Sequence, residues 1–382
     1  MTSFTSKDVA RIAGVSQSTV SYVMTGKRSI SEKTRQKVLA AMEQLTYQPH
    51  AGARALAGRR TQVIGLVVPF DTDGKAAALL PFIETIAHCA RERDHEVLLV
   101  TADQGSAGLR RLAGRALCDA IVLMDILEHD ERVPVAAELG VPVVLVGVPD
   151  DPAGLHCVDL DFEEAARLAV DELAATGHDE IVLVGWGAAV TSRRTNYAVR
   201  FLRSAQRQAG LHGIPLTVLE PVERGREAAR QAADRILTHD FTSRPGHPIA
   251  PPALPEGGGR LAPLGEQPVP AHAALGEQSG RASGRGTGGR IGVVVAQGTV
   301  VAPLIHALRL RGVVPGRDLS LIGVSPDQEA EGSFTNVSEE PRDVSRRAMD
   351  TLFQLLDPAP GPAIRAIQLV APRLTRRNTV MP

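Results

Sequence analysis

The sequence predicts an all-α head of about fifty residues and a larger α/β body with two doubly wound parallel-sheet lobes. Residues 1–46 show helical apolar spacing and no strand pattern. From Val63 onward, short β-branched runs alternate with helical segments, which is typical of a parallel sheet covered by helices on both faces. With about nine candidate strands, two lobes fit better than one sheet.

The first of three helices expected in the head is Ser6–Ala13. Thr5 and Asp8 form a capping-box-like start, and Gly14 ends the helix. The inward side chains should be Val9, Ala10 and Ile12.

Two serines can cap the other helices of the head. Ser16 precedes the second helix, Gln17–Met24, and Ser31 precedes the third. Helical spacing predicts that the residues facing inward are Val20, Val23, Val38, Met42 and Leu45.

The body should begin at residue 62. Its expected strands are Val63–Val68, Val97–Val100, Ala120–Met124, Val143–Val146, Ile181–Val184, Thr217–Leu219, Ile291–Ala296 and Leu319–Gly323. Helices are expected at Leu79–Arg93, Phe162–Thr176, Tyr197–Gln208 and Arg226–Thr238. Residues 241–289 hold 19 Gly or Pro in 49 positions and no apolar periodicity, so we expect a disordered insertion there.

Charge separates the head from the body. Residues 1–60 carry ten Lys or Arg and three acids, a net charge of +7, whereas the whole chain is at −1. A basic head on an acidic body suggests a polyanion-binding module. Three scattered cysteines fit a reducing compartment, and neither a leader peptide nor a membrane span is evident, so a cytoplasmic protein without membrane association is expected.

The segment from Val9 to Ser21 has the residue types of a helix-turn-helix. Ala10 lets two helices cross closely, Gly14 permits the tight turn, and Val15 with Val20 fills the space beneath. The second helix then presents three polar side chains outward, where base edges would lie in a major groove: Gln17, Ser18 and Tyr22.

At this point the sequence resembles the lactose-repressor (LacI/GalR) family of transcriptional regulators. The match runs through KDVARIAGVSQSTVSYVMTGKRSISEKTRQKVLAAMEQLTYQPHAGARALA and GRRTQVIGLVVP. Weaker matches follow at Cys118–Met124, Leu139–Val144, Thr176–Ile181, Gly312–Gly323 and Leu374–Thr379. The resemblance implies a DNA-binding domain at 1–48, a hinge helix and linker at 49–61, and an effector-binding and dimerisation domain at 62–382.

The resemblance also assigns roles in DNA binding. The base-reading residues would be Gln17, Ser18 and Tyr22. Phosphate contacts would come from Thr5, Ser16, Thr19, Ser21, Ser31, Thr34 and Tyr47. The hinge would bring His50, Ala53 and Leu56 to the minor groove, with Leu56 as a wedge between base pairs. Plain alternatives are that Ser16 and Ser31 act as caps, that Tyr22 contacts no base, and that Leu56 packs on the body.

The body resembles a periplasmic binding protein, with a ligand cleft between lobes and three chain crossings. Lobe one is expected at about 62–161 and 338–358, and lobe two at about 162–337 and 359–382.

The cleft departs from the family pattern at three positions. Tyr197 stands where the usual arginine would be, Gln297-Gly298 stand where the usual Asn-Asp pair would be, and Ser325 replaces an aspartate. A sugar is therefore not predicted, because those groups normally pair with sugar hydroxyls. Candidate cleft residues are Phe70, Asp71, Asp125, Asp150, Tyr197, Gln297 and Ser325; several could equally be surface or core residues. Arg193 and Arg194 would be either solvated or a site for an anionic effector.

These observations predict a regulator, most simply a repressor, that binds palindromic double-stranded operator DNA as a homodimer and responds to a small-molecule effector. A dimer is favoured over a tetramer because no apolar heptads follow the body. Two alternatives remain: a regulator whose degenerate cleft has no sugar effector, and a small-molecule-binding protein of the transport type. The sequence contains no catalytic, metal or cofactor motif, so neither an enzyme nor a bound cofactor or metal is expected.

Overall fold

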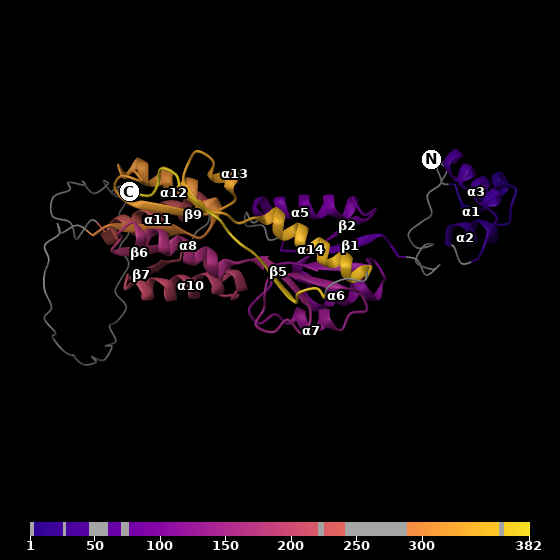
Figure 1. The fold of residues 1–382 in the computed structure, drawn as a ribbon, viewed down its shortest axis with the longest axis horizontal. Coiled ribbons are helices and arrows are strands. Elements are labelled where there is room, and N and C mark those ends of the chain that lie inside the picture. The colour runs from indigo at the N-terminus through magenta and orange to yellow at the C-terminus, as the bar shows by residue number, and fades with distance from the viewer. Residues whose placement is uncertain are drawn as a thin grey trace, which may run out of the picture.

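The computed structural model describes residues 4–25, 28–45, 60–69, 76–220, 225–240, 289–358 and 363–382. The predicted insertion at 241–289 lies outside the described residues except for its last residue, and the hinge and linker at 49–61 do so except for residues 60 and 61. The described chain forms the expected head and a body of two α/β lobes (Figure 1).

The head consists of α1 (Ser6–Ala13), α2 (Gln17–Thr25) and α3 (Glu32–Gln44). Gly14 ends α1 in the left-handed conformation, with φ of 67°, as its position predicts. The small core contains the buried residues Val9, Ala10, Ala13, Val20, Val23, Val38 and Ala41. The prediction for Ile12 is wrong: this side chain is 41% exposed, because it lies beside the α1 face that Val9, Ala10 and Ala13 bury and not within it.

Lobe one is a six-stranded sheet in the order β11-β5-β4-β3-β1-β2, and all its strands are parallel. The strands are β1 (Val63–Val68), β2 (Glu96–Thr101), β3 (Ala120–Leu123), β4 (Val143–Val146), β5 (His156–Leu160) and β11 (Ile367–Val370). One face packs on α5 (Ala76–Arg91) and α14 (Pro341–Leu356). The other packs on α6 (Gly105–Gly114) and α7 (Arg132–Ala137), with η1 (Ala102–Gln104) preceding α6.

Lobe two has the order β12-β10-β9-β8-β6-β7, with only β12 antiparallel to its neighbour. Its strands are β6 (Glu180–Val184), β7 (Leu216–Leu219), β8 (Ile291–Val295), β9 (Ser320–Val324), β10 (Thr335–Val337) and β12 (Leu374–Thr375). Helices α8 (Phe162–Ala175) and α10 (Asn196–His212) cover one face, and α11 (Gly225–Asp240) and α12 (Gly298–Leu310) cover the other. The short helices α9 (Ala188–Thr191) and α13 (Asp327–Ala330) follow β6 and β9.

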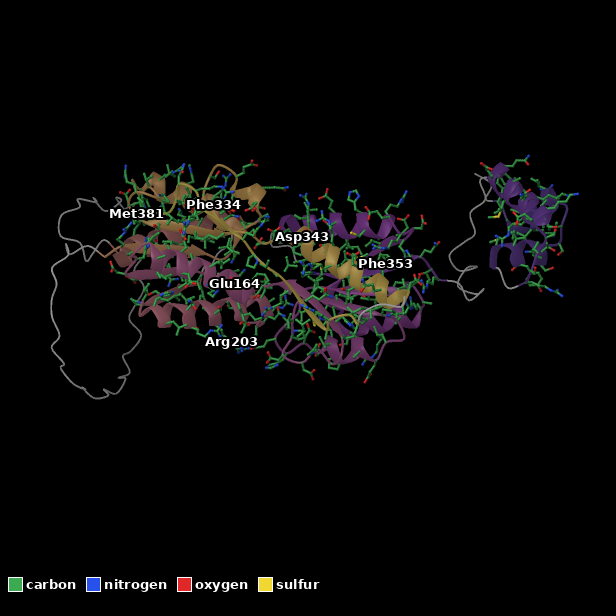
Figure 2. All side chains as sticks on the ribbon, in the orientation of Figure 1. Glu164, Arg203, Phe334, Asp343, Phe353 and Met381 are labelled. Carbon is green, nitrogen blue, oxygen red and sulfur yellow. The ribbon has the colours of Figure 1, made fainter. Side chains whose placement is uncertain are left out.

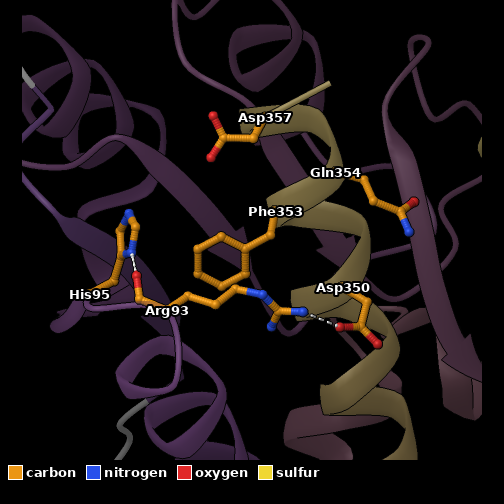
Figure 3. A pocket seen from close by; sticks show the side chains of 6 residues that line it. All are labelled: Arg93, His95, Asp350, Phe353, Gln354 and Asp357. Carbon is orange, nitrogen blue, oxygen red and sulfur yellow. Dashed lines mark hydrogen bonds and ion pairs between the residues drawn. The ribbon is translucent and has the colours of Figure 1, made fainter. Parts of the chain in front are cut away.

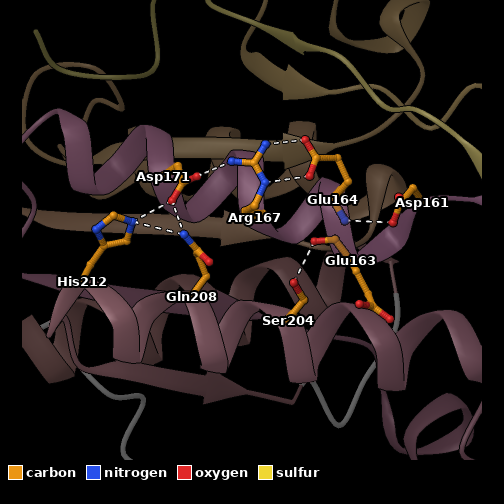
Figure 4. Close-up of polar contacts among 8 residues, drawn as sticks. All are labelled: Asp161, Glu163, Glu164, Arg167, Asp171, Ser204, Gln208 and His212. Carbon is orange, nitrogen blue, oxygen red and sulfur yellow. Dashed lines mark hydrogen bonds and ion pairs between the residues drawn. The ribbon is translucent and has the colours of Figure 1, made fainter.

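Side chains fill both lobes between the sheets and helices, with Phe353 in the first lobe and Phe334 in the second (Figure 2). The rim between α8 and α10 is polar: Asp171 accepts hydrogen bonds from Arg167 and Gln208 and contacts His212, each at 2.6 Å, and the Ser204 hydroxyl donates to the Glu163 carbonyl at 2.8 Å (Figure 4). These contacts hold α10, on which Arg200 and Arg203 pair with Asp159 and Glu128 of lobe one.

The predicted fold class is confirmed, with corrections in detail. Residues 359–382 do not all belong to lobe two, because β11 pairs with β5 in lobe one. The sequence analysis did not predict four of the strands, namely β5, β10, β11 and β12. They are short or carry polar residues: Asp159 interrupts β5, and β10 is only Thr335-Asn336-Val337. The chain crosses between the sheets three times, after β5, after β10 and after β11.

Candidate functional site

The amino end of α2 is held by short side-chain hydrogen bonds. The backbone N–H of Thr19 donates to Ser16 Oγ at 3.0 Å, so Ser16 is a helix cap. The hydroxyls of Ser18 and Thr19 each lie 2.8 Å from the same oxygen. Ser31 caps α3 in the same way, accepting from the Thr34 N–H at 3.3 Å. The capping alternative for both serines is therefore confirmed.

The polar face of α2 is presented to solvent while α1 steadies it. Gln17 and Ser18 are exposed, and Gln17 donates from Nε2 to Ser6 Oγ on α1 at 2.9 Å. Tyr22 is half-buried, with the Arg28 guanidinium 5.9 Å from its ring centre. The amino end of α2 lies beside this face, and a helix amino end attracts anions such as phosphate.

The remaining predicted DNA contacts divide into two groups. Those at the head surface are Thr5, Ser16, Ser21 and Ser31, which are exposed, and Thr19 and Thr34, which are half-buried. Tyr47, His50, Ala53 and Leu56 lie outside the described residues. At the start of α1, Thr5 donates from its backbone N–H and its hydroxyl to Asp8, which lowers the pKa of that carboxyl.

In the body, the carboxyl ends of both sheets face each other. The segment after β3 contacts the segment before α10: the Asn196 N–H donates to the Ile126 carbonyl at 3.1 Å, and Leu127 forms a β-bridge with Thr195. β3 and β6 each run parallel to their neighbours in the sheet. The carboxyl ends of those neighbouring strands therefore also lie on the side of each sheet that faces the other lobe. Ligands of open parallel sheets bind outside such carboxyl ends.

Arginines of lobe two bind acids of lobe one across this junction. Glu128, whose side chain is 4% exposed, accepts from Arg203 at 2.6 Å and also pairs with Arg194. Burial opposes ionisation of Glu128, but the hydrogen bond from Arg194 and the charge of Arg203 outweigh it and lower the pKa of this carboxyl. Arg193 pairs with Asp125 at 2.9 Å. Neither Arg193 nor Arg194 is simply solvated or left free for an anion.

The candidate cleft residues occupy different environments. Asp125 is buried in its pair with Arg193, whereas Asp150 is exposed and lies 3.5 Å from His129. Gln297 is half-buried and donates to the Gly185 carbonyl at 3.2 Å. Ser325 is fully buried, and within the described chain its hydroxyl has no hydrogen-bond partner. Phe70 and Asp71 lie outside the described residues.

Tyr197 belongs to an aromatic cluster next to the junction. Its ring centre lies 5.5 Å from that of Phe162 and 5.4 Å from that of Trp186, and Trp186 also meets Phe201 at 5.6 Å. Sequence reasoning missed Trp186, although the chain's single tryptophan directly behind a predicted strand was an available signal.

Asn196 was also missed. It is 2% exposed, and in the described part of the chain neither atom of its side-chain amide has a hydrogen-bond partner. Its Nδ2 lies 3.4 Å from the point that a Cβ on Gly147, at the end of β4, would occupy. No local pattern distinguishes this residue, because its surroundings come from lobe one.

A separate cavity of about 350 Å³ lies away from the junction, between the start of β2 and the end of α14 (Figure 3). The residues lining it are Arg93, His95, Asp350, Phe353, Gln354 and Asp357. Arg93 pairs with Asp350 at 2.9 Å, and Asp357 is paired with Arg60 at 2.7 Å. The cavity therefore adjoins the point where the linker enters lobe one, and it is not the cleft.

The head and body together define a protein with a helix-turn-helix domain and a periplasmic-binding-protein-like domain. Residues 5–50 match the bacterial regulatory proteins of the lacI family, and residues 170–380 match the periplasmic binding protein-like domain. The chain therefore carries a lacI-family helix-turn-helix head and belongs, through residues 170–380, to the proteins with a periplasmic binding protein-like domain. Among the described residues, no helix is both long and apolar enough to span a bilayer.

Curated relatives include catabolite control protein A of Priestia megaterium, 34% identical over 181 residues, which are 46% of this chain and 53% of that protein. The HTH-type transcriptional regulator MalR of Streptococcus pneumoniae (strain ATCC BAA-334 / TIGR4) is 33% identical over 189 residues, 47% of this chain and 56% of that one. The chain thus spans about half the length of the curated relatives it matches. Both relatives are regulators rather than enzymes.

Solved structures share the fold. The lac repressor dimer bound to operator and the anti-inducer ONPF superposes with a TM-score of 0.71 at 22% identity, covering 100% of both chains. The complex of the transcriptional regulator CelR with cellobiose gives a TM-score of 0.58 at 19% identity, covering 98% of this chain and 99% of that one. At these identities the likeness concerns the fold alone.

Proposed function

We propose that the protein is a sequence-specific DNA-binding transcriptional regulator, acting in the cytoplasm as a repressor. The observation that carries this proposal is the exposed polar face of α2, capped by Ser16 and held against α1 by Gln17. In this proposal Gln17, Ser18 and Tyr22 read base edges, and the exposed hydroxyls and lysines of the head contact phosphates.

The protein would bind a palindromic operator as a homodimer. Support comes from β2, an edge strand of lobe one whose Leu98 and Leu99 are 36% and 42% exposed. Leu80 on the neighbouring α5 is 62% exposed. Exposed apolar edge strands pair readily, and a twofold axis beside β2 would cover both copies at once. Two heads would then address two half-sites of the operator.

A small-molecule effector in the cleft would control DNA affinity. The lobes meet through ion pairs such as Glu128 with Arg203 and Asp125 with Arg193. A ligand that favours one relative position of the lobes would shift the equilibrium between them, and the linker at the edge of lobe one would transmit the change to the head. The buried polar side chains of Asn196 and Ser325, which lack partners among the described residues, support a ligand at this place.

Selection of bound duplexes from a random oligonucleotide pool tests the proposal. The full-length protein should enrich an inverted repeat and bind it at least about a thousandfold more tightly than bulk DNA. Enrichment of no duplex sequence at low salt would refute the proposal.

Variants of the head sharpen this test. Gln17→Ala should weaken binding to the selected operator by about 1–3 kcal/mol and relax preference at one position. Gln44→Ala, an exposed glutamine at the end of α3, is the matched control and should leave preference unchanged.

A further inference from the structure

Two of the three proposed base-reading side chains contact residues that lie outside α2. Gln17 Nε2 donates to the hydroxyl oxygen of Ser6, the first residue of α1, at 2.9 Å. The Arg28 guanidinium carbon lies 5.9 Å from the centre of the Tyr22 ring, within the range of a cation–π contact. Arg28 belongs to the segment between α2 and α3. The two readers are therefore restrained from segments on either side of α2 in the chain.

The contact with Ser6 leaves the recognition groups of Gln17 free. Gln17 is exposed, and Ser6 is half-buried. A glutamine amide has two N–H donors and one carbonyl acceptor, and the bond to Ser6 uses one N–H. The other N–H and Oε1 remain, and an amide N–H beside an amide oxygen is the pair of groups that reads adenine in the major groove. Ser6 thus restrains Gln17 without consuming the groups that recognise a base.

The Ser6 hydroxyl is not needed to start α1. The N-cap of this helix is Thr5, whose backbone N–H and hydroxyl donate to Asp8 at 3.0 Å and 2.8 Å. Removal of the Ser6 hydroxyl should therefore leave α1 folded, so that an effect on DNA recognition can be measured on an intact head.

Arg28 contacts the ring of Tyr22 and not its hydroxyl. A cation is attracted to the face of an aromatic ring, which leaves the phenolic hydroxyl at the end of the ring available to donate to or accept from a base edge. Arg28 is exposed, whereas Tyr22 is half-buried. A phosphate contact is the other role open to an exposed arginine, and the two roles differ in what they do to base preference.

We propose that Ser6 and Arg28 are positioning residues that set the base preference of the protein, because they hold Gln17 and Tyr22 in the conformations that meet the DNA. The inference rests on the proposed function, since it concerns the same reading face. A side chain already held in its binding conformation loses little conformational freedom when DNA binds, and this gain applies to the base that the held conformation fits. Once released, the side chain adapts to other bases as well, so preference falls while the affinity supplied by phosphate contacts remains.

The experiment measures base preference at single operator positions. Operators are selected from random duplexes with the full-length wild type. The position read by each side chain is then identified as the one at which Gln17→Ala or Tyr22→Ala loses preference. Preference is the ratio of the dissociation constants for the best alternative base and for the selected base. If neither change alters preference at any position, the side chains are not readers and the inference is overturned.

Ser6→Ala should lower preference at the Gln17 position about threefold, as expected for one lost neutral hydrogen bond, and leave the Tyr22 position unchanged. Ser6→Thr keeps the hydroxyl and should restore preference. In a Gln17→Ala background Ser6→Ala should have no further effect, because no side chain is left to hold. The exposed Gln44, changed to Ala, is the control and should alter no position. Unchanged preference in Ser6→Ala, or an equal loss at every position, contradicts the assignment of Ser6.

Arg28→Ala should lower preference at the Tyr22 position about threefold, as expected for one lost cation–π contact. Arg35→Ala is the matched control, because it removes the same charge from an exposed site on α3 and should leave preference at every position unchanged. If Arg28→Ala weakens all duplexes equally and keeps the wild-type preference, Arg28 is a phosphate contact and its assignment as a positioning residue is wrong.

The wild type and the variants together separate the two claims. A wild type that enriches no duplex sequence refutes the proposed function. If the wild type selects an operator, and Ser6→Ala and Arg28→Ala retain its preference at every position, the proposed function stands and the inference about these two residues fails.

Discussion

The head and the cleft handle their polar side chains in opposite ways. On the head, the polar residues of α2 are exposed and bond to near neighbours, as Ser16 does with Thr19 and Gln17 with Ser6. In the cleft, Asn196 and Ser325 are buried and, within the described residues, unpaired. When no DNA is bound, water hydrogen-bonds to the exposed polar groups of the head, so this surface has no desolvation cost. The cleft has a desolvation cost that only an added polar group removes.

This difference has a consequence for stability. Changes to the outer face of the head should alter DNA recognition with little effect on folding, while the head's small core should be sensitive. In the cleft, removal of a functional polar group should stabilise the unliganded protein. Sites built for ligands often show this conflict between stability and function.

The largest effect is expected from Val20→Asp. Val20 is 0% exposed and belongs to the head's core of seven buried residues. An unpaired charge there costs several kcal/mol, on the order of the stability of so small a domain, so the head should unfold. Operator binding measured by fluorescence anisotropy should be lost, while calorimetry should show an unchanged transition for the body.

Leu39→Asp is the control for this change. Leu39 lies on α3 and is 51% exposed, so a charge there remains hydrated. This variant should fold and bind operator. Retention of operator binding by Val20→Asp would show that the head is more tolerant than its core predicts.

The same contrast explains what the sequence could predict. The head is determined by local signals: Ser16 and Ser31 precede their helices, and Gly14 adopts the left-handed turn that its position requires. Within the head, only the predicted burial of Ile12 is wrong, because an apolar side chain in a short helix can lie outside the face that packs on the core. The alternating pattern of the body likewise gave the two parallel sheets.

The cleft depends on contacts between distant segments. Asn196 is buried by Ile126 and Gly147 of the other lobe, and no pattern around residue 196 announces them. Arg193 and Arg194 look solvated in the sequence, yet each meets an acid of lobe one. The lobe assignment of β11 failed for the same reason, since it follows from pairing with β5 and not from its own residues.

A pH-dependent stability is the second expected effect. The ordinary pKa of a glutamate is 4.5, and that of Glu339 is raised to about 8 by burial and by Glu329. Between these values the folded protein keeps a proton that the unfolded chain releases. Its free energy of unfolding should therefore fall as pH rises from about 5 to 8, by up to about 1.4 kcal/mol per pH unit.

Urea denaturation of the wild type and of Glu339→Gln at pH 5, 6, 7 and 8 measures this slope. The variant is neutral at every pH, so its advantage over the wild type should grow toward pH 8 and vanish near pH 5. Parallel pH profiles for the two proteins would mean that Glu339 ionises normally, and the cleft would then resemble the head in having its charges satisfied by water.

The smallest effect is expected from substitution of two buried serines, which differ in whether the side-chain hydroxyl has a hydrogen-bond partner. Ser320 begins β9 and Ser325 directly follows it, and both are 0% exposed. Ser320 Oγ accepts the Met381 N–H at 2.9 Å, whereas Ser325 Oγ has no partner in the described chain. Ser320→Ala loses a hydrogen bond and should destabilise the protein by about 1 kcal/mol, while Ser325→Ala removes an unsatisfied hydroxyl and should stabilise it by about 1 kcal/mol.

Denaturation midpoints of the two variants, measured side by side without ligand, decide the point. Both changes remove one hydroxyl oxygen from a fully buried serine at an end of β9. The effects of the lost side-chain volume therefore largely cancel when the two variants are compared. Opposite signs would establish that the cleft holds an unpaired polar group at a cost in folding energy. Equal losses would mean that Ser325 is bonded in solution, and the contrast with the head would then rest on Asn196 alone.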